Sequence, residues 1–434
     1  MNLKVKRQLS FSEDQRLVEN TAEEPQDLFH NTAEQFEKHL VDFIQFGKPT
    51  LIEHYPDRQL DIPIYVNEYW TSKQRAAHSL HEVSYRACFK PQLPAFFIHR
   101  LTKKGDIVYD PFMGRGTTAL EAALNQRIPY GCDINPLSKI LLSPRLSPPD
   151  LISLKQTLQE IELNAETEID RDLLTFYDKD TLKELTNLRA YFIEREKNRT
   201  LSALESWIRM VATNRLSGHS PGFFSVYTLP PNQATSIVAQ EKINAKRNQK
   251  PEYKDIKKLI YKKSKSLLKS CSEHDRRLLK EVKEKSRLIT GSSSKTSDIP
   301  SSSVKLVVTS PPFLDVVNYK GDNWLRCWFN NIIAEDVCIW QLKKPKDWQE
   351  RMTEVFCELK RVLVPGGYIA FEVGEVRGGS LLLETLVVPA ALNAGLNPLL
   401  VMINDQEFTK TANCWGVSNL SKGTNTNRIV FIQK

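Results

Sequence analysis

The stretch from residue 106 to residue 133 limits the possible folds more than any other part of the chain. It contains an apolar strand pattern at 106–110, a turn with two glycines, an Ala/Leu-rich helix pattern at 117–125 and a second strand pattern at 128–133. Strand, turn, helix and strand in this order form a βαβ unit, and such units build parallel sheets that are covered by helices. The chain is therefore predicted to have an α/β core.

A second α/β stretch follows in the C-terminal third of the chain. Its predicted elements are strands at 287–291, 304–308, 368–373, 399–403 and 428–432, helices at 348–364 and 381–394, and a turn at 365–367. Together the two stretches predict one doubly wound, Rossmann-like α/β sheet of about seven strands. Residues 150–286 contain long charged helix patterns instead, and they predict a helical inserted domain. The expected units are an extension (1–87), two core segments (88–149 and 287–434) and this insertion (150–286).

The charge of the chain is concentrated in one segment. The whole chain has 60 Lys+Arg and 52 Asp+Glu, a net charge of +8. Residues 242–287 alone contain 17 Lys/Arg and 6 Asp/Glu, a net charge of +11, so the remainder is slightly acidic. Hydrophobic residues make up 41% of the chain, which excludes a disordered or fibrous protein. The basic segment indicates either a surface for a polyanion or a solvated helical face.

The cysteine and histidine pattern gives no sign of a metal site. Seven cysteines are scattered without a Cys-x-x-Cys pair, which favours a reducing cytoplasm over a disulfide framework. His78 and His81 are close enough in sequence to share a metal, but no second ligand pair lies near them, so a structural role is favoured and no metal is predicted. Charged and proline residues interrupt the apolar stretch 381–403, and no membrane span is expected.

The turn of the βαβ unit has its own ligand-binding pattern. Its sequence is Asp110-Pro111-Phe112-Met113-Gly114-Arg115-Gly116-Thr117-Thr118. The glycines allow a tight turn and a close approach to a ligand, and the following helix offers unpaired N–H groups. No Gly-Lys-Ser/Thr follows, and the third glycine of the dinucleotide fingerprint is absent. Asp133, at the end of the next strand, can accept hydrogen bonds from a ribose diol. The pattern predicts a ligand with a ribose that need not have a pyrophosphate.

A second pattern follows the strand at 304–308. The tetrapeptide is Ser310-Pro311-Pro312-Phe313, and the carboxyl ends of strands in an open α/β sheet are where ligands bind. The prolines stiffen the backbone and have no N–H groups, which leaves a hydroxyl, carbonyls and an aromatic face. Such a set can accept hydrogen bonds from an amino group and stack on a planar ring. A proline-rich loop without function is the alternative, as Pro230-Pro231 in the same chain illustrates.

Together with the Arg-Val-Leu-Val-Pro-Gly-Gly sequence at 361–367, these motifs resemble those of the DNA amino-methyltransferases, which modify exocyclic nitrogens of cytosine or adenine. The resemblance covers residues 88–146 and 287–434. It implies that 88–149 is the cofactor half, that 287–434 is the catalytic half, and that the insertion between them contains the target-recognition region.

The resemblance also implies roles for single residues. The implied cofactor is S-adenosyl-L-methionine, with Asp133 on its ribose hydroxyls. The residues implied to hold the cofactor are Lys90, Pro91, Asp110, Pro111, Phe112, Gly114, Gly116, Thr117, Thr118, Asp133 and Gly291. The implied catalytic residues are Ser310, Pro311, Pro312 and Phe313. Hydrogen bonds from the target amine to the Ser310 hydroxyl and the Pro311 carbonyl would make its nitrogen more pyramidal and more nucleophilic. Phe313 would stack on a base rotated out of the duplex.

The first residue of the tetrapeptide bears on the target base. Ser-Pro-Pro is more typical of cytosine-N4 members and Asp-Pro-Pro of adenine-N6 members, so Ser310 favours cytosine. The chain departs from the family at Gly291-Ser292, where Gly-Asp is common, and Asp298 is the expected substitute for the missing acid. The alternatives are adenine-N6 methylation of DNA, methylation of a base in structured RNA, and a non-catalytic nucleic-acid-binding protein. The intact motifs argue against the last.

The insertion is expected to contact duplex DNA. The basic residues expected to contact phosphates are Lys246, Arg247, Lys257, Lys258, Lys262 and Lys263. A second candidate group, His219, Phe223, Phe224 and Tyr227, fits a base pocket or wedge and fits a buried turn equally well. The expected setting is a restriction–modification system in a prokaryotic cytoplasm, with a separate cognate endonuclease.

Overall fold

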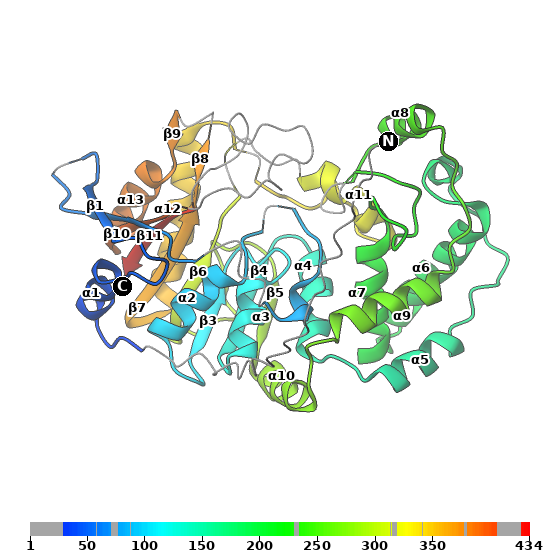
Figure 1. Ribbon diagram of the computed structural model, residues 1–434, viewed down its shortest axis with the longest axis horizontal. Coiled ribbons are helices and arrows are strands. Elements are labelled where there is room, and N and C mark those ends of the chain that lie inside the picture. Colours follow the sequence, from blue (N-terminus) through cyan, green and yellow to red (C-terminus); the bar gives the residue numbers. More distant parts are fainter. Residues whose placement is uncertain are drawn as a thin grey trace, which may run out of the picture.

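The computed structural model describes residues 29–57, 59–70, 77–86, 88–229, 234–312, 314, 319–340, 342–376, 380–405 and 427–434. Its centre is a nine-stranded sheet in the order β1-β2-β10-β11-β7-β6-β3-β4-β5 (Figure 1). The strands are β1 (Leu51–His54), β2 (Pro63–Asn67), β3 (Ile107–Asp110), β4 (Ile128–Asp133), β5 (Arg287–Thr290), β6 (Val304–Thr309), β7 (Leu363–Val373), β10 (Asn397–Asn404) and β11 (Asn427–Gln433). A separate ribbon pairs β8 (Glu375–Val376) with β9 (Leu381–Leu382).

The central strands form a doubly wound arrangement. Strands β7, β6, β3, β4 and β5 pair in parallel, whereas β11 is antiparallel to both of its neighbours. From β3 the chain runs outward to β4 and, after the insertion, to β5, and it then returns to β6 on the other side of β3. The strand order therefore reverses between β3 and β6, and crevices at such a switch point bind ligands.

The predicted Rossmann-like α/β class is confirmed, but the sheet has nine strands rather than about seven. The difference arises from residues 51–54 and 63–67, which form β1 and β2 and extend the sheet beyond β10. Both strands are short, and all four residues of β1 are exposed, so neither shows a strong apolar pattern. The N-terminal extension thus contributes strands to the core sheet.

The helices complete three layers around the sheet. They are α1 (Ala33–Val41), α2 (Gln92–Leu101), α3 (Thr117–Leu124), α4 (Leu137–Leu142), α5 (Leu151–Glu160), α6 (Lys179–Lys197), α7 (Ala203–Arg215), α8 (Ile237–Arg247), α9 (Ile256–Leu267), α10 (Glu273–Lys285), α11 (Tyr319–Phe329), α12 (Pro345–Val362) and α13 (Glu384–Asn393). Short 3₁₀ turns lie at Ser79–His81, Ser143–Leu146 and Arg171–Thr175. Alternate residues of β7 face opposite layers: Ile369 and Phe371 pack toward α12 and α13, and Tyr368 and Ala370 toward α1 and α2.

The helical insertion packs directly against the sheet domain, beside β5 (Figure 1). One hydrophobic cluster runs from α3 and α4 into α5, α6, α7 and α9, with the buried Trp207 of α7 within it. Helix α10 contacts α3 and β4, and α11, which follows β6 in the chain, packs on α7. Within the described ranges, no helix combines the length and the apolar character that crossing a bilayer requires.

Two local predictions are wrong. Residues 365–367, predicted as a turn, lie inside β7, where Gly366 has φ of +69° and the pairing register with β6 shifts between Val304 and Leu306. The Pro-Gly-Gly sequence therefore forms the irregular first part of β7, because β6 pairs with β7 on both sides of it. The predicted helix at 381–394 begins only at Glu384, since Leu381 and Leu382 pair with β8 instead.

Candidate cofactor and catalytic site

A pocket lies at the carboxyl ends of β6, β3, β4 and β5, at the switch point of the sheet. Its cavity volume is about 220 Å³, and the cavity is partly open to solvent. Its lining residues are Tyr85, Pro111, Phe112, Gly114, Asp133, Ile134, Asn135, Gly291, Ser292, Ser293, Ser310, Pro312, Cys338, Ile339 and Trp340. The structure thus brings the two predicted motifs to one pocket, although they are separated by the whole insertion.

The glycine turn after β3 has the conformation that its sequence predicts. Gly114 and Gly116 have φ of +51° and +78°, in the left-handed region that favours glycine. A Cβ atom on Gly116 would lie 2.8 Å from both Cδ atoms of Leu142, so this position also has no room for a side chain. The Asp133 carboxylate accepts hydrogen bonds from the backbone N–H groups of Gly114 and Asn135, both at 2.8 Å. These bonds hold Asp133 at the pocket wall, where lone pairs remain for a ligand.

Asp110 lies beneath the pocket rather than in its wall. Its carboxylate accepts hydrogen bonds from the Thr309 hydroxyl at 2.6 Å and the Phe112 N–H at 3.1 Å. Because Asp110 is buried, its pKa is raised to about 7. The Thr118 hydroxyl donates to the Val308 carbonyl at 3.0 Å. These two contacts tie the loop after β3 to the end of β6, so they fix the distance between the glycine turn and Ser310.

An acid that belongs to no sequence motif lies close to Ser310. Glu372 on β7 is 4% exposed and accepts a hydrogen bond from the Asn427 amide at 2.9 Å, and the nearby Ser310 hydroxyl favours the ionised form of its carboxyl. Burial raises the pKa of Glu372 to about 7. The signal in the sequence is an acid within the otherwise apolar strand Tyr-Ile-Ala-Phe-Glu-Val at 368–373. Such an interruption of a buried strand marks a candidate functional residue.

The Ser-Pro-Pro turn is fixed from the other side by α12. The indole N–H of the buried Trp348 donates to the Pro312 carbonyl at 2.9 Å. Pro312 and Ser310 line the pocket. Phe313, which was expected to stack on a base, lies outside the described residues. Aromatic rings at the pocket do include Phe112 and Trp340, which meet edge to face with their centroids 6.2 Å apart.

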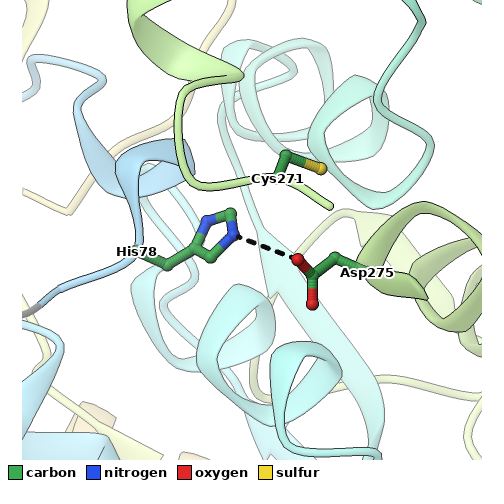
Figure 2. Close-up of side chains that lie close together, drawn as sticks. All are labelled: His78, Cys271 and Asp275. Atoms are coloured by element: carbon green, nitrogen blue, oxygen red, sulfur yellow. Dashed lines mark ion pairs between the residues drawn. The ribbon is translucent and has the colours of Figure 1, made fainter. Parts of the chain in front are cut away.

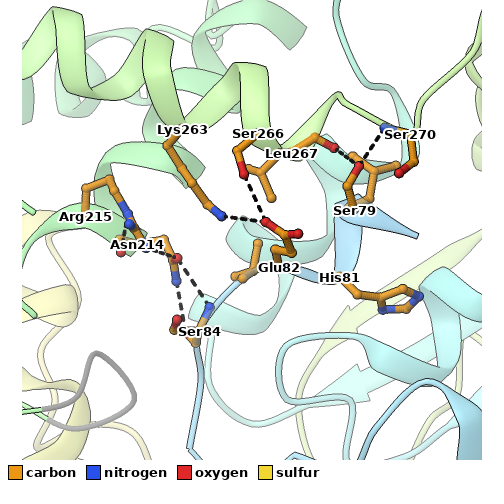
Figure 3. A network of polar contacts seen from close by, with 12 residues as sticks. Ser79, His81, Glu82, Ser84, Asn214, Arg215, Lys263, Ser266, Leu267 and Ser270 are labelled. Atoms are coloured by element: carbon orange, nitrogen blue, oxygen red, sulfur yellow. Dashed lines mark hydrogen bonds and ion pairs between the residues drawn. The ribbon is translucent and has the colours of Figure 1, made fainter. Parts of the chain in front are cut away.

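The segment 77–86 connects the pocket to the basic insertion. Tyr85 lines the pocket beside Gly114. Arg115 donates to the carbonyls of Val83 and Phe89, at 2.9 and 3.4 Å, which holds this segment over the glycine turn. Figure 3 shows the opposite side of the segment, where Glu82 faces helix α9. The Glu82 carboxylate accepts hydrogen bonds from the Lys263 ammonium group at 3.3 Å and from the Ser266 hydroxyl at 3.0 Å. The Ser79 hydroxyl donates to the Leu267 carbonyl at 2.7 Å. The segment bridges two parts of the molecule.

Several residues of the predicted cofactor set are not in the pocket wall. Lys90 and Pro91 precede α2, and neither lines the pocket. Pro111 and Phe112 do line it, whereas Thr117 and Thr118 are buried in the first turn of α3. Gly291 lines it and is followed by Ser292 and Ser293. Asp298, the expected substitute acid, is exposed and does not contribute to the pocket.

The predicted DNA-contacting residues divide into exposed and enclosed side chains. The exposed ones are Lys246, Arg247, Lys258, Lys262 and His219. Lys257 is half-buried and reaches the Gln159 carbonyl at 3.4 Å, and Arg247 lies over the Tyr227 ring at 3.8 Å. Lys263 is 14% exposed and paired with Glu82. Phe223 and Phe224 are buried, which fits the buried-turn interpretation for these two rings.

A cluster of His78, Cys271 and Asp275 lies where the segment before α2 meets the start of α10 (Figure 2). Its ligand-type atoms lie within 4.8 Å of one another. The Nδ1 atom of His78 accepts a hydrogen bond from the Leu80 N–H, which leaves the proton of a neutral ring on Nε2, the nitrogen facing Asp275. A metal would need the lone pair of that nitrogen, so a structural contact fits better. His81 lies apart from the cluster and contacts Glu121 at 2.8 Å.

Comparisons with known proteins found one family model, two curated relatives and several solved structures. Residues 7–139 match the model of the DNA methylase family. The type II methyltransferase M.MjaII of Methanocaldococcus jannaschii is 33% identical over 121 residues, which are 27% of this chain and 22% of that protein. The type II methyltransferase M.MvaI of Kocuria varians is 34% identical over 95 residues, 21% of this chain and 20% of that protein. The matches thus span about a fifth of the length of each relative.

A solved structure of a SAM-dependent methyltransferase from Methanosarcina mazei covers 77% of this chain and 94% of its own, at 12% identity and a TM-score of 0.29. The resemblance to DNA amino-methyltransferases, predicted from the motifs, is confirmed by the family match and the two relatives. These matches do not distinguish cytosine from adenine. The family match ends at residue 139, before the insertion and Ser310.

Proposed function

We propose that this chain, whose residues 7–139 match the DNA methylase family, transfers a methyl group from S-adenosyl-L-methionine to the N4 amine of cytosine in a specific duplex DNA sequence. The observation that carries the proposal is that Ser310 lines the same pocket as Gly114 and Asp133, with the buried acid Glu372 close to its hydroxyl. An acceptor for an amine and a carboxylate suited to a ribose thereby face one cavity.

The residues of the pocket fit this cofactor. Asp133 offers a carboxylate that is fixed by two backbone N–H groups, as the binding of a ribose diol requires. Gly114 lets the backbone approach the ligand, and Phe112 offers an apolar wall. When bound, S-adenosyl-L-methionine supplies an electrophilic methyl group. The protein residues have to bind it, to orient the target amine and to accept the proton that the amine loses.

Ser310 and Glu372 perform the last two tasks. The lone pair of an aryl amine is conjugated with its ring, so the amine is a poor nucleophile. When Glu372 is ionised it takes the hydrogen bond of the Ser310 hydroxyl, which turns the oxygen lone pairs of Ser310 toward the pocket. An amine hydrogen bonded to that oxygen becomes more pyramidal, with its lone pair free for attack. As the N–C bond forms, the nitrogen gives up one proton, for which Ser310 and Glu372 offer a route out.

The insertion serves as the DNA-contacting unit in this proposal. The exposed Lys246, Arg247, Lys258 and Lys262 supply positive charge beside the catalytic domain. Contacts of this kind position a duplex without reading its sequence. The target base must leave the stack to reach Ser310, since the pocket lies at the sheet edge. Two relatives are type II methyltransferases, and we extend the proposal to the modification enzyme of a restriction–modification system.

The decisive test combines a Ser310→Ala variant with identification of the product. Purified protein should transfer labelled methyl groups from the cofactor to duplex DNA, and S310A should lower kcat at least about 100-fold, as expected for the loss of a preorganised hydrogen-bonding group in the transition state. Mass spectrometry of the nucleosides from digested product should detect N4-methylcytosine.

The matched control is Ser297→Ala, which removes a hydroxyl from an exposed residue outside the pocket and should retain full activity. Detection of N6-methyladenine alone would contradict the cytosine assignment and keep the enzyme class. Full turnover by S310A would remove Ser310 from the mechanism, and a wild-type protein that transfers no methyl group to DNA would contradict the proposal as a whole.

A further inference from the structure

The geometry points to Arg215, the last residue of α7, as a binding site for a phosphate group of the DNA strand that carries the target base. This inference rests on the proposed function. It differs from the lysine contacts proposed above, because those side chains are exposed, whereas Arg215 is only 9% exposed. The site lies where the insertion meets the segment that leads to the pocket.

Figure 3 shows how Arg215 is connected to Ser84. The side-chain oxygen of Asn214 accepts hydrogen bonds from the Arg215 guanidinium at 3.1 Å and from the Ser84 N–H at 3.3 Å. The Ser84 carbonyl in turn accepts from the Asn214 amide at 2.9 Å and from Arg326 on α11 at 3.1 Å. Arg326 also lies 5.6 Å from the centroid of the Tyr85 ring, which lines the pocket. Arg215 is therefore close to the pocket without lining it.

Other cations at this junction are paired with acids. The Lys263 ammonium group lies 3.3 Å from the Glu82 carboxylate, and the Arg86 guanidinium lies 2.7 Å from the Asp322 carboxylate. Each of these positive charges is balanced inside the protein, so neither requires an external anion.

Arg215 has no carboxylate partner among the described residues. Its Nε and Nη2 atoms donate to the main-chain and side-chain oxygens of Asn214, at 3.0 and 3.1 Å, and its guanidinium lies 3.9 Å from the centroid of the Phe223 ring. Its Nη1 atom has no hydrogen bond to the described part of the chain and is not buried, so it can reach a ligand. Burial and, after it, the charge of Arg326 lower the pKa of Arg215 to about 10, so the guanidinium stays charged at neutral pH.

This positive charge is costly in the free protein. A nearly buried cation has lost most of its hydration, and without a counter-charge that loss is not offset. The neighbouring charge of Arg326 adds repulsion. An anion bound at Nη1 would supply the missing counter-charge, and the planar guanidinium matches the oxygens of a phosphate.

The proposed substrate brings phosphates to this place. A target base that has left the duplex to reach Ser310 remains attached to its strand, whose phosphates pass the mouth of the pocket. Arg215 lies next to that mouth through Ser84 and Tyr85. The carboxylate of S-adenosyl-L-methionine is a second possible anion. Arg215 is absent from the pocket wall that is proposed to hold this cofactor, which favours the phosphate.

The test compares wild-type protein with Arg215→Met, Arg215→Lys and Lys104→Met. R215M keeps apolar contact with Phe223 and removes the charge, whereas R215K keeps the charge. Lys104 is exposed at the amino end of β3, away from the pocket at the carboxyl end, so K104M is the matched control. Binding is measured by fluorescence anisotropy at several salt concentrations, with a labelled duplex that the wild type methylates.

R215M should weaken DNA binding at least about 10-fold and reduce the slope of log affinity against log salt concentration by about 0.9. R215K should keep the slope, and K104M should keep both the affinity and the slope. Calorimetric titration of S-adenosylhomocysteine should give the same affinity for R215M as for the wild type. Without DNA, the denaturant midpoint of R215M should equal or exceed that of the wild type, because an unbalanced charge is removed and Asn214 keeps its bond from Ser84.

The results that contradict the inference differ from one another. A lower denaturant midpoint for R215M, or an unfolded variant, would assign Arg215 a structural role. Unchanged DNA affinity and slope in R215M would exclude the phosphate contact. Weaker binding of S-adenosylhomocysteine by R215M would assign the charge to the cofactor's carboxylate. A wild-type protein that methylates no duplex would contradict the proposed function itself, along with the inference drawn from it.

Discussion

At the scale of single residues, the buried Glu372 predicts how activity depends on pH. Its pKa is raised to about 7 by burial, so the carboxyl is protonated below that pH. A protonated carboxyl donates to the Ser310 oxygen and turns the serine proton toward the amine, the wrong polarity for accepting a hydrogen bond. We therefore expect kcat, measured with labelled cofactor between pH 5.5 and 9, to rise through about pH 7 and then level off.

The variant Glu372→Gln checks this explanation, because its amide has no negative charge and does not titrate at any pH in this range. It should lower kcat at least about 10-fold and remove the rise near pH 7. A change of kcat near pH 7 that remains in this variant is assigned to Asp110, because burial also raises the pKa of Asp110 to about 7. The free energy of unfolding should change in the opposite direction. Between about pH 4.5 and 7 the folded wild type keeps Glu372 protonated, whereas the unfolded chain has lost this proton, so the protein becomes less stable as the pH rises through this range. A variant with wild-type rate and pH profile would exclude Glu372 from positioning Ser310.

The sequence predicted Gly114, Asp133 and Ser310 because each belongs to a short pattern at the end of a strand, and the structure places all three in one pocket. Glu372 and Tyr85 are outside such patterns. Glu372 reaches Ser310 only because β6 and β7 pair in register, Thr309 opposite Phe371. Tyr85 enters the pocket because Arg115 holds its segment over the glycine turn. Both positions depend on tertiary contacts that no local pattern encodes.

At the scale of elements, helix α9 offers a test of the proposed DNA contact, because it contains one exposed lysine and one enclosed lysine side by side. Lys262 is exposed, whereas its neighbour Lys263 is mostly buried and paired with Glu82. Each phosphate contact contributes about 0.9 to the slope of log affinity against log salt concentration. We expect Lys262→Ala to reduce that slope by about one, measured by fluorescence anisotropy of labelled duplex DNA at several salt concentrations.

Lys263→Ala serves as the matched variant on the same helix. It should leave the salt slope unchanged and lower the free energy of unfolding by about 1 kcal/mol or less, because its partner Glu82 is 56% exposed. A reduced slope for K263A together with an unchanged slope for K262A would reverse the assignment. It would mean that bound DNA displaces Glu82 from Lys263.

At the scale of the whole molecule, the sequence predicted the fold except for strands that have no regular pattern of hydrophobic residues. The βαβ unit at 106–133 and the sheet strands β5, β6, β7, β10 and β11 were predicted, because buried strands are nearly continuous apolar runs. Strands β1 and β2 were missed, since β1 is an exposed edge strand and β2 joins the rest of the sheet only through β10, more than three hundred residues later in the sequence. The N-terminal segment is predictable as structure only with the rest of the sheet in place.

Helix α1 tests whether this N-terminal segment is an integral part of the fold. Phe36 is fully buried, and its ring lies 4.8 Å from that of Phe431 on β11, the last strand of the chain. Phe36→Ala should lower the free energy of unfolding, measured with denaturant, by about 3–5 kcal/mol. Val41→Ala, at a 41% exposed residue of the same helix, should cost about 0.5 kcal/mol or less. Equal effects would mean that α1 is dispensable. A large difference, in one cooperative transition, would mean that the first and last described elements stabilise the sheet on which the pocket is built.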